Sequence, residues 1–543
     1  MRLTSATALA ILAAFVPMAA PAQTAGADAA VAEAGKAAGE NRHADAIDAY
    51  RRAISAAPER RGEWLLDLAD QLTWAKRYEE AVALYREAVD DADATRARRA
   101  RMGLARALSW DDRHGQAIAE YDRVLARDPK DRDARLARAQ VLSWAGRHDE
   151  ALAAYEALSR DDPEDVEAKR GAARVLSWRG RYRAAIEGAQ GLLEEAPRDR
   201  ETVTILAEAL DWMGRPDRAE RVLREQLERD AGDARAASLL DDLARRRQPS
   251  VRVDFREFDQ SDDLEISELA LAARFPLAQG RGFIGPRYTQ AVFRPNRGDV
   301  ERILVRRPGL YGGFRISDAV DLNAGLSLDV INTRGAEGDH TLPTFDGYLT
   351  YRPNDLLRFD LGASRYTFDS EETLREGLVA TQIGGSVDFY PNEAAQLSAR
   401  FNRAYHSDGN VRLWWQAQVT RRLMDRPRLV VGYRYTGFRF SDPGQGGYYN
   451  PDRYRTHELL FSGSGQLARR LRWDLRLVGG YETETPGGSR FTINAGASAA
   501  RPLGRSTELE LAYDYSTSRT RSVGGFERGI ARVTLFRRFG SRH

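Results

Sequence analysis

Two periodicities of apolar residues divide the chain. Up to about residue 247 apolar positions recur at helical spacing, and from residue 248 onward they alternate with polar ones. Helical spacing places apolar side chains on one face of a helix, whereas alternation places them on one face of a strand. The pattern predicts a multi-domain chain, with an all-α region over residues 31–247 and an all-β region over residues 248–543.

A tryptophan recurs near the end of one helical segment in every repeat of the first region. These are Trp74, Trp110, Trp144, Trp178 and Trp212, at spacings of 36, 34, 34 and 34 residues. A 34-residue period built from paired helices is the signature of the tetratricopeptide repeat. Because each helix pair buries its apolar stripe only against its neighbours, we expect a solenoid of about six repeats.

Smaller residues keep the same period. Alanines are expected where two helices cross, and glycines followed by arginine are expected in the turns between helices: Ala46, Ala81, Ala117, Ala151 and Ala219, and Gly146, Gly180 and Gly214. His114 and His148 occupy turn positions that hold Tyr78 and Tyr182 in other repeats. We therefore interpret both histidines as aromatic variants and expect no metal site.

The repeated tryptophans have two interpretations. In the tetratricopeptide pattern that these repeats resemble, the residue at the end of the first helix lies beside the concave groove. This resemblance implies that stacked indoles would form a platform for sugar rings or a peptide. Alternatively, each indole packs against the next repeat and seals the turn. Packing is the favoured interpretation, because large aromatic residues at fixed spacing usually belong to a core.

The second region has the plan of an outer-membrane barrel. Short turns rich in Pro, Asn, Asp and Gly fall near residues 279, 318, 354, 392, 425, 469 and 503, with longer polar stretches between them. Short turns at one end, long loops at the other and an even strand number are typical of such barrels. We expect about sixteen antiparallel strands around a lumen, with the short turns facing the repeats.

Strand parity assigns the polar positions to the lumen and the apolar positions to lipid. The lumen candidates are Asp321, Asp329, Asp346, Asp360, Arg434, Arg472, Asp474, Arg476, Glu508, Glu510 and Asp514. Tyrosines at strand ends are expected to form the interfacial girdles: Tyr351, Tyr390, Tyr433, Tyr435, Tyr481 and Tyr515. The strand that ends at Phe539 resembles the terminal signal of barrel-assembly clients, which usually ends on the aromatic residue itself.

The amino terminus predicts export. Arg2 precedes the apolar run Ala6–Ala19 and the small residues Ala20, Pro21 and Ala22, which is a secretory-signal pattern. We expect a signal peptide over residues 1–22 and a spacer over residues 23–30. The chain has no cysteine, which excludes disulfides, cysteine zinc sites and thiol nucleophiles.

Charges of both signs are mixed along the chain, with a net charge of +2. The sequence therefore has no basic patch of the kind that binds nucleic acid.

No catalytic motif lies in the secondary structure that its chemistry requires. A G-x-G-x-x-G at Gly280, Gly282 and Gly285 precedes a strand pattern and not the helix that would hold a pyrophosphate. Glu508 and Glu510 share a strand face at a spacing loosely compatible with glycosidase chemistry, but charges beside arginines more often line a lumen. We expect neither an enzyme nor a cofactor.

One motif carries a family resemblance. The sequence L-S-W-x-G-R at Leu142–Arg147 and Leu176–Arg181, followed by a barrel, resembles the tetratricopeptide-repeat outer-membrane porins that export cellulose or poly-N-acetylglucosamine, and YaiO-type barrels. The resemblance implies exopolysaccharide export for biofilm, from periplasm through the outer membrane of a Gram-negative bacterium. It also implies that the repeats guide polymer or dock periplasmic or inner-membrane biosynthetic proteins.

Two other functions remain open at this point. In one, the repeats bind a polypeptide client and the chain translocates surface proteins or lipoproteins. In the other, the barrel loops form a surface receptor and the repeats anchor a periplasmic partner.

Overall fold

The computed structural model describes residues 20–540 except 261–263, 278–279, 296–301, 334–337, 445–446, 468–469 and 519–526. The apolar run of the expected signal peptide, Ala6–Ala19, lies outside the described residues. The chain divides into two compact units, Met1–Leu176 and Ser177–His543, and the second contains the last helices of the repeats together with the barrel.

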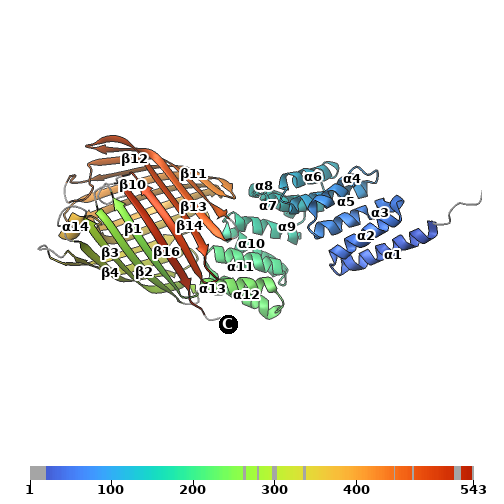
Figure 1. Cartoon of the computed structure of the whole chain (residues 1–543), viewed down its shortest axis with the longest axis horizontal. Coiled ribbons are helices and arrows are strands. Elements are labelled where there is room, and N and C mark those ends of the chain that lie inside the picture. The colour runs from blue at the N-terminus through green and yellow to red at the C-terminus, as the bar shows by residue number, and fades with distance from the viewer. Residues whose placement is uncertain are drawn as a thin grey trace, which may run out of the picture. The chain divides into compact units, whose positions relative to one another are not determined.

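Helices precede the first strand, as predicted (Figure 1). They form six consecutive pairs and a closing helix within the described residues: α1 (Ala20–Gly39), α2 (His43–Ala56), α3 (Arg61–Trp74), α4 (Tyr78–Ala88), α5 (Ala94–Trp110), α6 (His114–Arg127), α7 (Arg132–Trp144), α8 (His148–Asp161), α9 (Val166–Trp178), α10 (Tyr182–Glu195), α11 (Arg200–Trp212), α12 (Pro216–Arg229) and α13 (Ala234–Arg246). Residues 23–30, expected as a spacer, belong to α1, since their alanines favour a helix.

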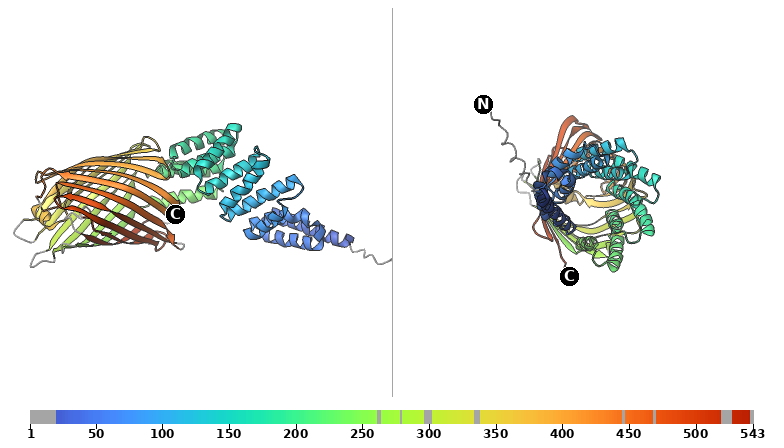
Figure 2. Two further views of the ribbon diagram at one scale, coloured as in Figure 1. Left: turned by 90° about the horizontal axis from the view of Figure 1, so that it is seen from above. Right: turned by 90° about the vertical axis from the view of Figure 1, so that its right-hand side faces the viewer.

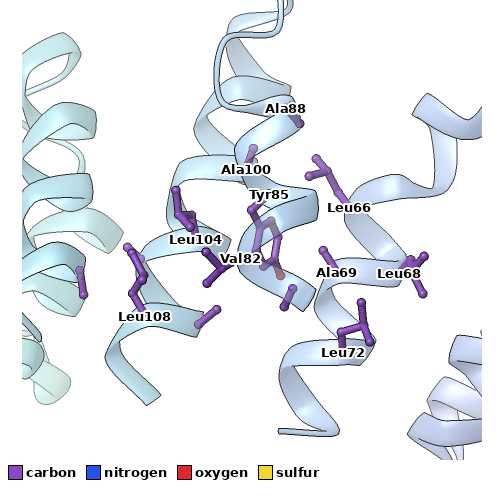
Figure 3. Packing of buried hydrophobic residues seen from close by; sticks show 14 of the residues in the cluster. Leu66, Leu68, Ala69, Leu72, Val82, Tyr85, Ala88, Ala100, Leu104 and Leu108 are labelled. Carbon is purple, nitrogen blue, oxygen red and sulfur yellow. The ribbon is translucent and has the colours of Figure 1, made fainter. Parts of the chain in front are cut away.

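The helix crossings depend on small residues. Ala46, Ala81 and Ala117 have no exposed surface. Tyr85 of α4 is fully buried and fills the space above Gly103 of α5, where a Cβ atom would collide with its ring. Figure 3 shows this tyrosine between the leucines of α3 and α5. The alanine and tyrosine positions of the repeat are therefore core positions.

The turns inside the repeats require a left-handed residue. Gly146, Gly180 and Gly214 have φ values of 73°, 74° and 80°. Lys76 and Asp112 hold the equivalent position of earlier repeats at φ values of 62° and 57°. Glycine adopts this conformation without the steric cost that other residues meet, which explains the recurring Gly-Arg pair.

An aspartate at a helix start links consecutive repeats in the first unit. The Asp131 carboxylate accepts from the Ala134 amide at 3.1 Å and from the Arg98 guanidinium of α5 at 2.8 Å. Asp165 repeats the arrangement with Ala168 and Arg132. One side chain thus caps a helix and binds the preceding repeat.

The second region is a closed barrel of sixteen antiparallel strands, counted over the described residues, which confirms the predicted fold class. In Figure 2 the strands run obliquely around the barrel. They are β1 (Ser250–Gln260), β2 (Leu264–Leu277), β3 (Gly282–Pro295), β4 (Ile303–Arg315), β5 (Val320–Asn332), β6 (His340–Tyr351), β7 (Leu357–Thr367), β8 (Val379–Asn392), β9 (Ala395–His406), β10 (Val411–Asp425), β11 (Arg428–Phe440), β12 (Arg453–Leu467), β13 (Leu471–Thr485), β14 (Gly488–Pro502), β15 (Thr507–Ser516) and β16 (Arg528–Arg538). The barrel closes where β16 pairs with β1, from Ser250 opposite Arg538 to Gln260 opposite Arg528.

The two ends of the barrel differ, as the turn pattern predicted. Short turns near residues 318, 354, 392, 425 and 503 lie at one end, here called the turn end. The predicted turns near residues 279 and 469 lie on or beside residues outside those described. Longer connections, among them helix α14 (Glu371–Glu376) and the described residues of the segment 441–452, lie at the opposite end, here called the loop end.

The outer face of the barrel is apolar. Leu326, Leu361 and Leu459 expose 68%, 64% and 70% of their surface, on the strand face opposite the polar residues. An outward apolar band on a closed barrel fits an outer-membrane protein. None of the described helices is long and apolar enough to cross a membrane.

Gly103→Ala is predicted to destabilise the repeats. The added methyl group collides with the Tyr85 ring, and overpacking of this kind costs about 1–3 kcal/mol. Gly115→Ala is the matched control, because a Cβ atom there meets nothing within 4 Å. Thermal unfolding followed by circular dichroism should show a lower helix melting temperature for the first variant alone. Equal melting temperatures for the two variants would contradict this packing.

Asp131→Asn is predicted to remove a pH-dependent part of the stability. The Arg98 guanidinium, with the Ala134 amide, holds the pKa of Asp131 below its ordinary value. Its contribution is therefore fully present above the unfolded pKa of about 4 and is lost as the pH falls through the folded pKa. Asparagine can still cap the helix, so the variant loses the ion pair with Arg98, at a cost of about 0.5–1 kcal/mol at pH 7.

The measurement is chemical denaturation at pH 7 and pH 3. The difference between wild type and Asp131→Asn should shrink at the lower pH. Asp133→Asn is the control, since this neighbouring carboxylate is largely exposed. A difference that stays constant with pH would contradict the assigned role of the carboxylate.

Candidate functional site

The inner face of the barrel carries the charged residues. Arg287 of β3 binds Asp346 of β6 at 2.6 Å, although β4 and β5 lie between these strands. Such a contact is possible only across the concave face of the sheet. The side chains that share this parity therefore face the lumen.

The structure brings every lumen candidate into an ion pair. The partners are arginines and carboxylates on the same or nearby strands: Arg315–Asp321 (2.6 Å), Arg307–Asp329 (2.9 Å), Arg287–Asp346 (2.6 Å), Arg358–Asp360 (3.0 Å), Arg434–Glu458 (2.7 Å), Arg472–Glu508 (2.5 Å), Arg476–Asp474 (3.1 Å), Arg476–Asp514 (3.8 Å) and Arg532–Glu510 (3.1 Å). Glu508 and Glu510 are held by different arginines, an arrangement that neutralises both carboxylates and does not set up an acid and base pair.

Aromatic side chains also face the lumen. Phe283 of β3 and Tyr311 of β4 pack edge to face, with ring centroids 5.5 Å apart. Tyr348 of β6 exposes 44% of its surface on the face that carries Asp346, and Trp414 of β10 lies on the same lining. Sequence reasoning missed these residues because it assigned aromatic residues to the lipid interface.

Tyr390 differs from its predicted place. Its neighbour Phe389 points outward, whereas Tyr390 lines a cavity at the turn end, so it is not a girdle residue. Tyr351, Tyr433, Tyr481 and Tyr515 do have exposed rings on the outer face. Side chains alternate between the two faces of β8, so Tyr390 points inward because Phe389 points outward, whereas the other predicted girdle residues lie at outward positions of their strands.

Loop segments pack inside the loop end. Leu374 of α14 is fully buried against inward residues of β1 to β5, among them Phe258 and Phe293. The segment 441–452 contributes Tyr448 to a second apolar cluster at this end. The Ser370 hydroxyl donates to the Gly447 carbonyl at 3.2 Å and so joins the two segments. The lumen is thus partly filled at the loop end.

The last repeats dock on the turn end of the barrel. The Asp355 carboxylate, in the turn between β6 and β7, accepts from the Arg183 amide in the first turn of α10 at 3.0 Å. Burial raises the pKa of Asp355, while the amides of α10 oppose that rise. Asp318, in the turn between β4 and β5, binds Arg218 of α12 at 3.0 Å. Each turn thus places a carboxylate at the positive end of a helix.

Arginines of the repeat turns complete this docking. The Arg181 guanidinium donates to the Pro391 carbonyl at 3.1 Å, and Arg215 binds Asp318. In earlier repeats the equivalent arginine binds the residue three positions later, as in Arg77–Glu80 and Arg147–Glu150.

The residue three positions after Arg181 is Ala184, and after Arg215 it is Arg218. Arg215 also binds Asp217, two positions later. The docking turns thus lack only the carboxylate three positions after the arginine. Arg113 of an earlier repeat shares this feature, because its third following residue is Gln116, so it does not mark the interface in the sequence.

Three cavities connect the docked repeats with the lumen. The entry cavity, of about 510 Å³, is lined by Trp178, Tyr182 and Trp212 of the repeats and by Tyr390 of the barrel. A second cavity, of about 400 Å³, contains Phe283 and Tyr348. The two share Arg315, Arg352 and Arg358, and the second shares Tyr348 with a third cavity that includes Trp414.

The repeated tryptophans are neither buried nor fully exposed. Trp74, Trp144, Trp178 and Trp212 each expose between 38% and 52% of their surface at the end of a first helix. Trp74 and Trp110 are in edge-to-face contact, with centroids 5.0 Å apart. Each indole therefore packs with one part and offers another to solvent.

The comparison with family models identifies the helical region. The tetratricopeptide-repeat model matches residues 110–175, 145–202 and 178–243. The helices over residues 110–243 are tetratricopeptide repeats. A search of curated proteins finds no match.

Solved structures that match parts of the chain include an outer membrane secretin and several tetratricopeptide repeat proteins. A bacterial polysaccharide outer membrane secretin is 16% identical, with a TM-score of 0.44, over 54% of this chain and 99% of that one. A tetratricopeptide repeat protein from Parabacteroides merdae is 17% identical, with a TM-score of 0.35, over 40% of this chain and 86% of that one. YrrB, described as a repeat protein with an unusual peptide-binding site, is 16% identical, with a TM-score of 0.26, over 35% and 97%.

Asp355→Ala is predicted to loosen the docked helix α10. Removal of the carboxylate leaves the first amides of α10 without this acceptor, at a cost of about 1 kcal/mol. Hydrogen exchange of the Arg183 and Ala184 amides should accelerate about fivefold if local opening governs exchange. Asp355→Asn keeps an acceptor and should have a smaller effect.

The control is Asp425→Ala, in a turn whose carboxylate binds Arg422 of its own hairpin. It should leave exchange in α10 unchanged. Equal protection of α10 in wild type and Asp355→Ala would contradict the docking role.

Proposed function

We propose that the protein is an outer-membrane porin that exports a polysaccharide, with the repeats at the entrance of the lumen. In this proposal residues 1–22 are a signal peptide, residues 31–247 form a periplasmic repeat domain and residues 248–543 form the barrel. The repeats receive the polymer or hold the proteins that make it. The turn end then faces the periplasm, and the loop end faces the cell exterior.

The side chains of the lumen support passive passage of a polysaccharide and not a chemical reaction on it. Most of the lumen carboxylates are held by an arginine, as in Arg434–Glu458 and Arg472–Glu508. Paired charges offer weak, replaceable hydrogen bonds to hydroxyl groups along the path. A chain bound weakly at many sites can slide, whereas one bound tightly at a single site cannot.

The observation that carries the proposal is the continuity of aromatic residues from the repeats into the barrel. Trp178 and Trp212 line the entry cavity, Tyr348 lines the second and third cavities, and Trp414 lines the third. Sugar rings present apolar faces that stack on aromatic side chains, while their hydroxyl groups bind polar ones. Alternating aromatic and charged residues along one path therefore suit a saccharide chain.

Deletion of the gene is predicted to abolish secretion of a surface polysaccharide. Wild-type protein should restore secretion, and Trp178→Ala/Trp212→Ala should restore it several-fold less well, because stacking at the entrance is lost. Trp74→Ala is the control, an equally exposed indole of the first unit. Secreted carbohydrate is measured, and heat-modifiable migration verifies the folded barrel.

Unchanged surface polymer in the deletion strain, with a folded barrel present in the wild type, would contradict export. Loss of a surface protein in place of polymer would instead favour translocation of a polypeptide.

A further inference from the structure

The entry cavity differs from the lumen in its charge. In the lumen, arginines and carboxylates pair along the strands. Among the described residues that line the entry cavity there are seven arginines but only three carboxylates, Asp318, Asp355 and Glu393. Arginines therefore outnumber carboxylates in the lining of the entrance.

Residues outside the lining share in these ion pairs. Asp318 binds Arg215 and Arg218, neither of which lines the cavity. Glu393 lies 3.8 Å from the lining residue Arg422, and Arg422 also binds Asp425. Asp321 binds Arg315 and Arg352, and Asp360 binds Arg358. An anion would therefore be bound by arginines that donate to acceptors other than carboxylates.

Several arginines near the entrance donate to uncharged acceptors. The Arg183 guanidinium donates to the Arg352 carbonyl at 2.7 Å and to the Asp318 carbonyl at 3.3 Å. Arg281, on the second cavity, donates to the carbonyls of Arg315 and Ile316. A carbonyl orients a guanidinium without cancelling its charge. Arg274, also on the second cavity, lies 4.0 Å from the Phe283 ring centroid.

Aromatic faces lie among these charges. Trp178, Trp212, Tyr182 and Tyr390 share the entry cavity with the arginines. In the entry cavity, helices α9 to α11 supply the first three of these side chains and β8 supplies Tyr390. The volume of the cavity is within the range of small-molecule sites.

We infer that the entry cavity selects an acidic polysaccharide, in which sugar rings stack on the indoles and uronate-type carboxylates bind the arginines. Arginine matches a carboxylate with two parallel donors, which gives both attraction and orientation. Positive charge at the mouth also concentrates a polyanion before it enters. This inference rests on the proposed export function and adds the charge class of the polymer.

The test measures, by calorimetry, how tightly oligomer probes bind to the full chain in detergent micelles. Three probes of matched length are compared: a galacturonate hexamer, a neutral cellohexaose and a glutamate hexapeptide. The galacturonate hexamer should bind at least tenfold more tightly than cellohexaose at low salt, and the gap should narrow at 0.5 M NaCl because salt screens the arginines. It should also bind more tightly than the glutamate hexapeptide, which has charge without sugar rings.

Variants separate the two halves of the site. Arg183→Gln should weaken galacturonate binding about tenfold and leave cellohexaose binding unchanged. Arg274→Gln, on strand β2 of the second cavity, provides a second test at a residue of the barrel. Trp178→Ala should weaken both saccharides. Arg224→Gln, on the exposed side of α12, is the control and should change neither.

Equal affinity for the galacturonate hexamer and cellohexaose would overturn the inference, as would equal affinity for the glutamate hexapeptide. Undiminished galacturonate binding by both arginine variants would overturn it as well. These outcomes leave export itself standing, because export is tested by deletion and secreted carbohydrate. A neutral chain that binds equally well and loses affinity in Trp178→Ala would mean that the porin carries an uncharged polymer.

Discussion

Closure of the sheet by β16 on β1 is the constraint on which the rest of the structure depends. In a bilayer every backbone amide and carbonyl needs a partner inside the protein, and only a closed sheet supplies one for each strand. Pairing from Ser250 opposite Arg538 to Gln260 opposite Arg528 removes the last open edges. Closure fixes the side to which each alternate residue points, so it also decides that Asp329 faces the lumen while Leu328 faces outward.

Attachment of the repeats follows from the turn end that closure creates. Turns at one end of the barrel present Asp318 and Asp355, and the starts of α12 and α10 present positive charge to them. In these repeats the turn arginines, Arg181 and Arg215, contact the barrel. A generic helical repeat is thereby adapted to hold its tryptophans at the mouth of the barrel.

Local patterns predicted most of the fold. The 34-residue period located the helix pairs, and alternation located the strands and the inward position of residues such as Asp346 and Glu510. Pairing between distant strands could not be predicted in this way. The contact between Arg287 and Asp346 depends on the curvature of the sheet, and strand parity alone carries no information about which arginine lies opposite.

The entry cavity could not be predicted either, because it also depends on contacts between distant parts of the sequence. It combines residues from α9 to α11 with residues from several barrel turns, far apart in the sequence. Tyr390 was assigned to lipid because a tyrosine at a strand end usually lies there, whereas its parity turns it inward. The tryptophans were visible in the sequence, but their partial exposure depends on how neighbouring helices pack.

The central claim, that a saccharide chain passes through this lumen, is tested most directly by crosslinking in living cells. A photoreactive amino acid is placed at position 348, whose side chain faces the lumen, or at position 351, whose side chain faces outward on the same strand. After illumination the purified barrel is tested for attached carbohydrate. The account predicts carbohydrate on the protein labelled at position 348 and none on that labelled at position 351. Attached polypeptide in place of carbohydrate at position 348, or equal labelling at both positions, would contradict it.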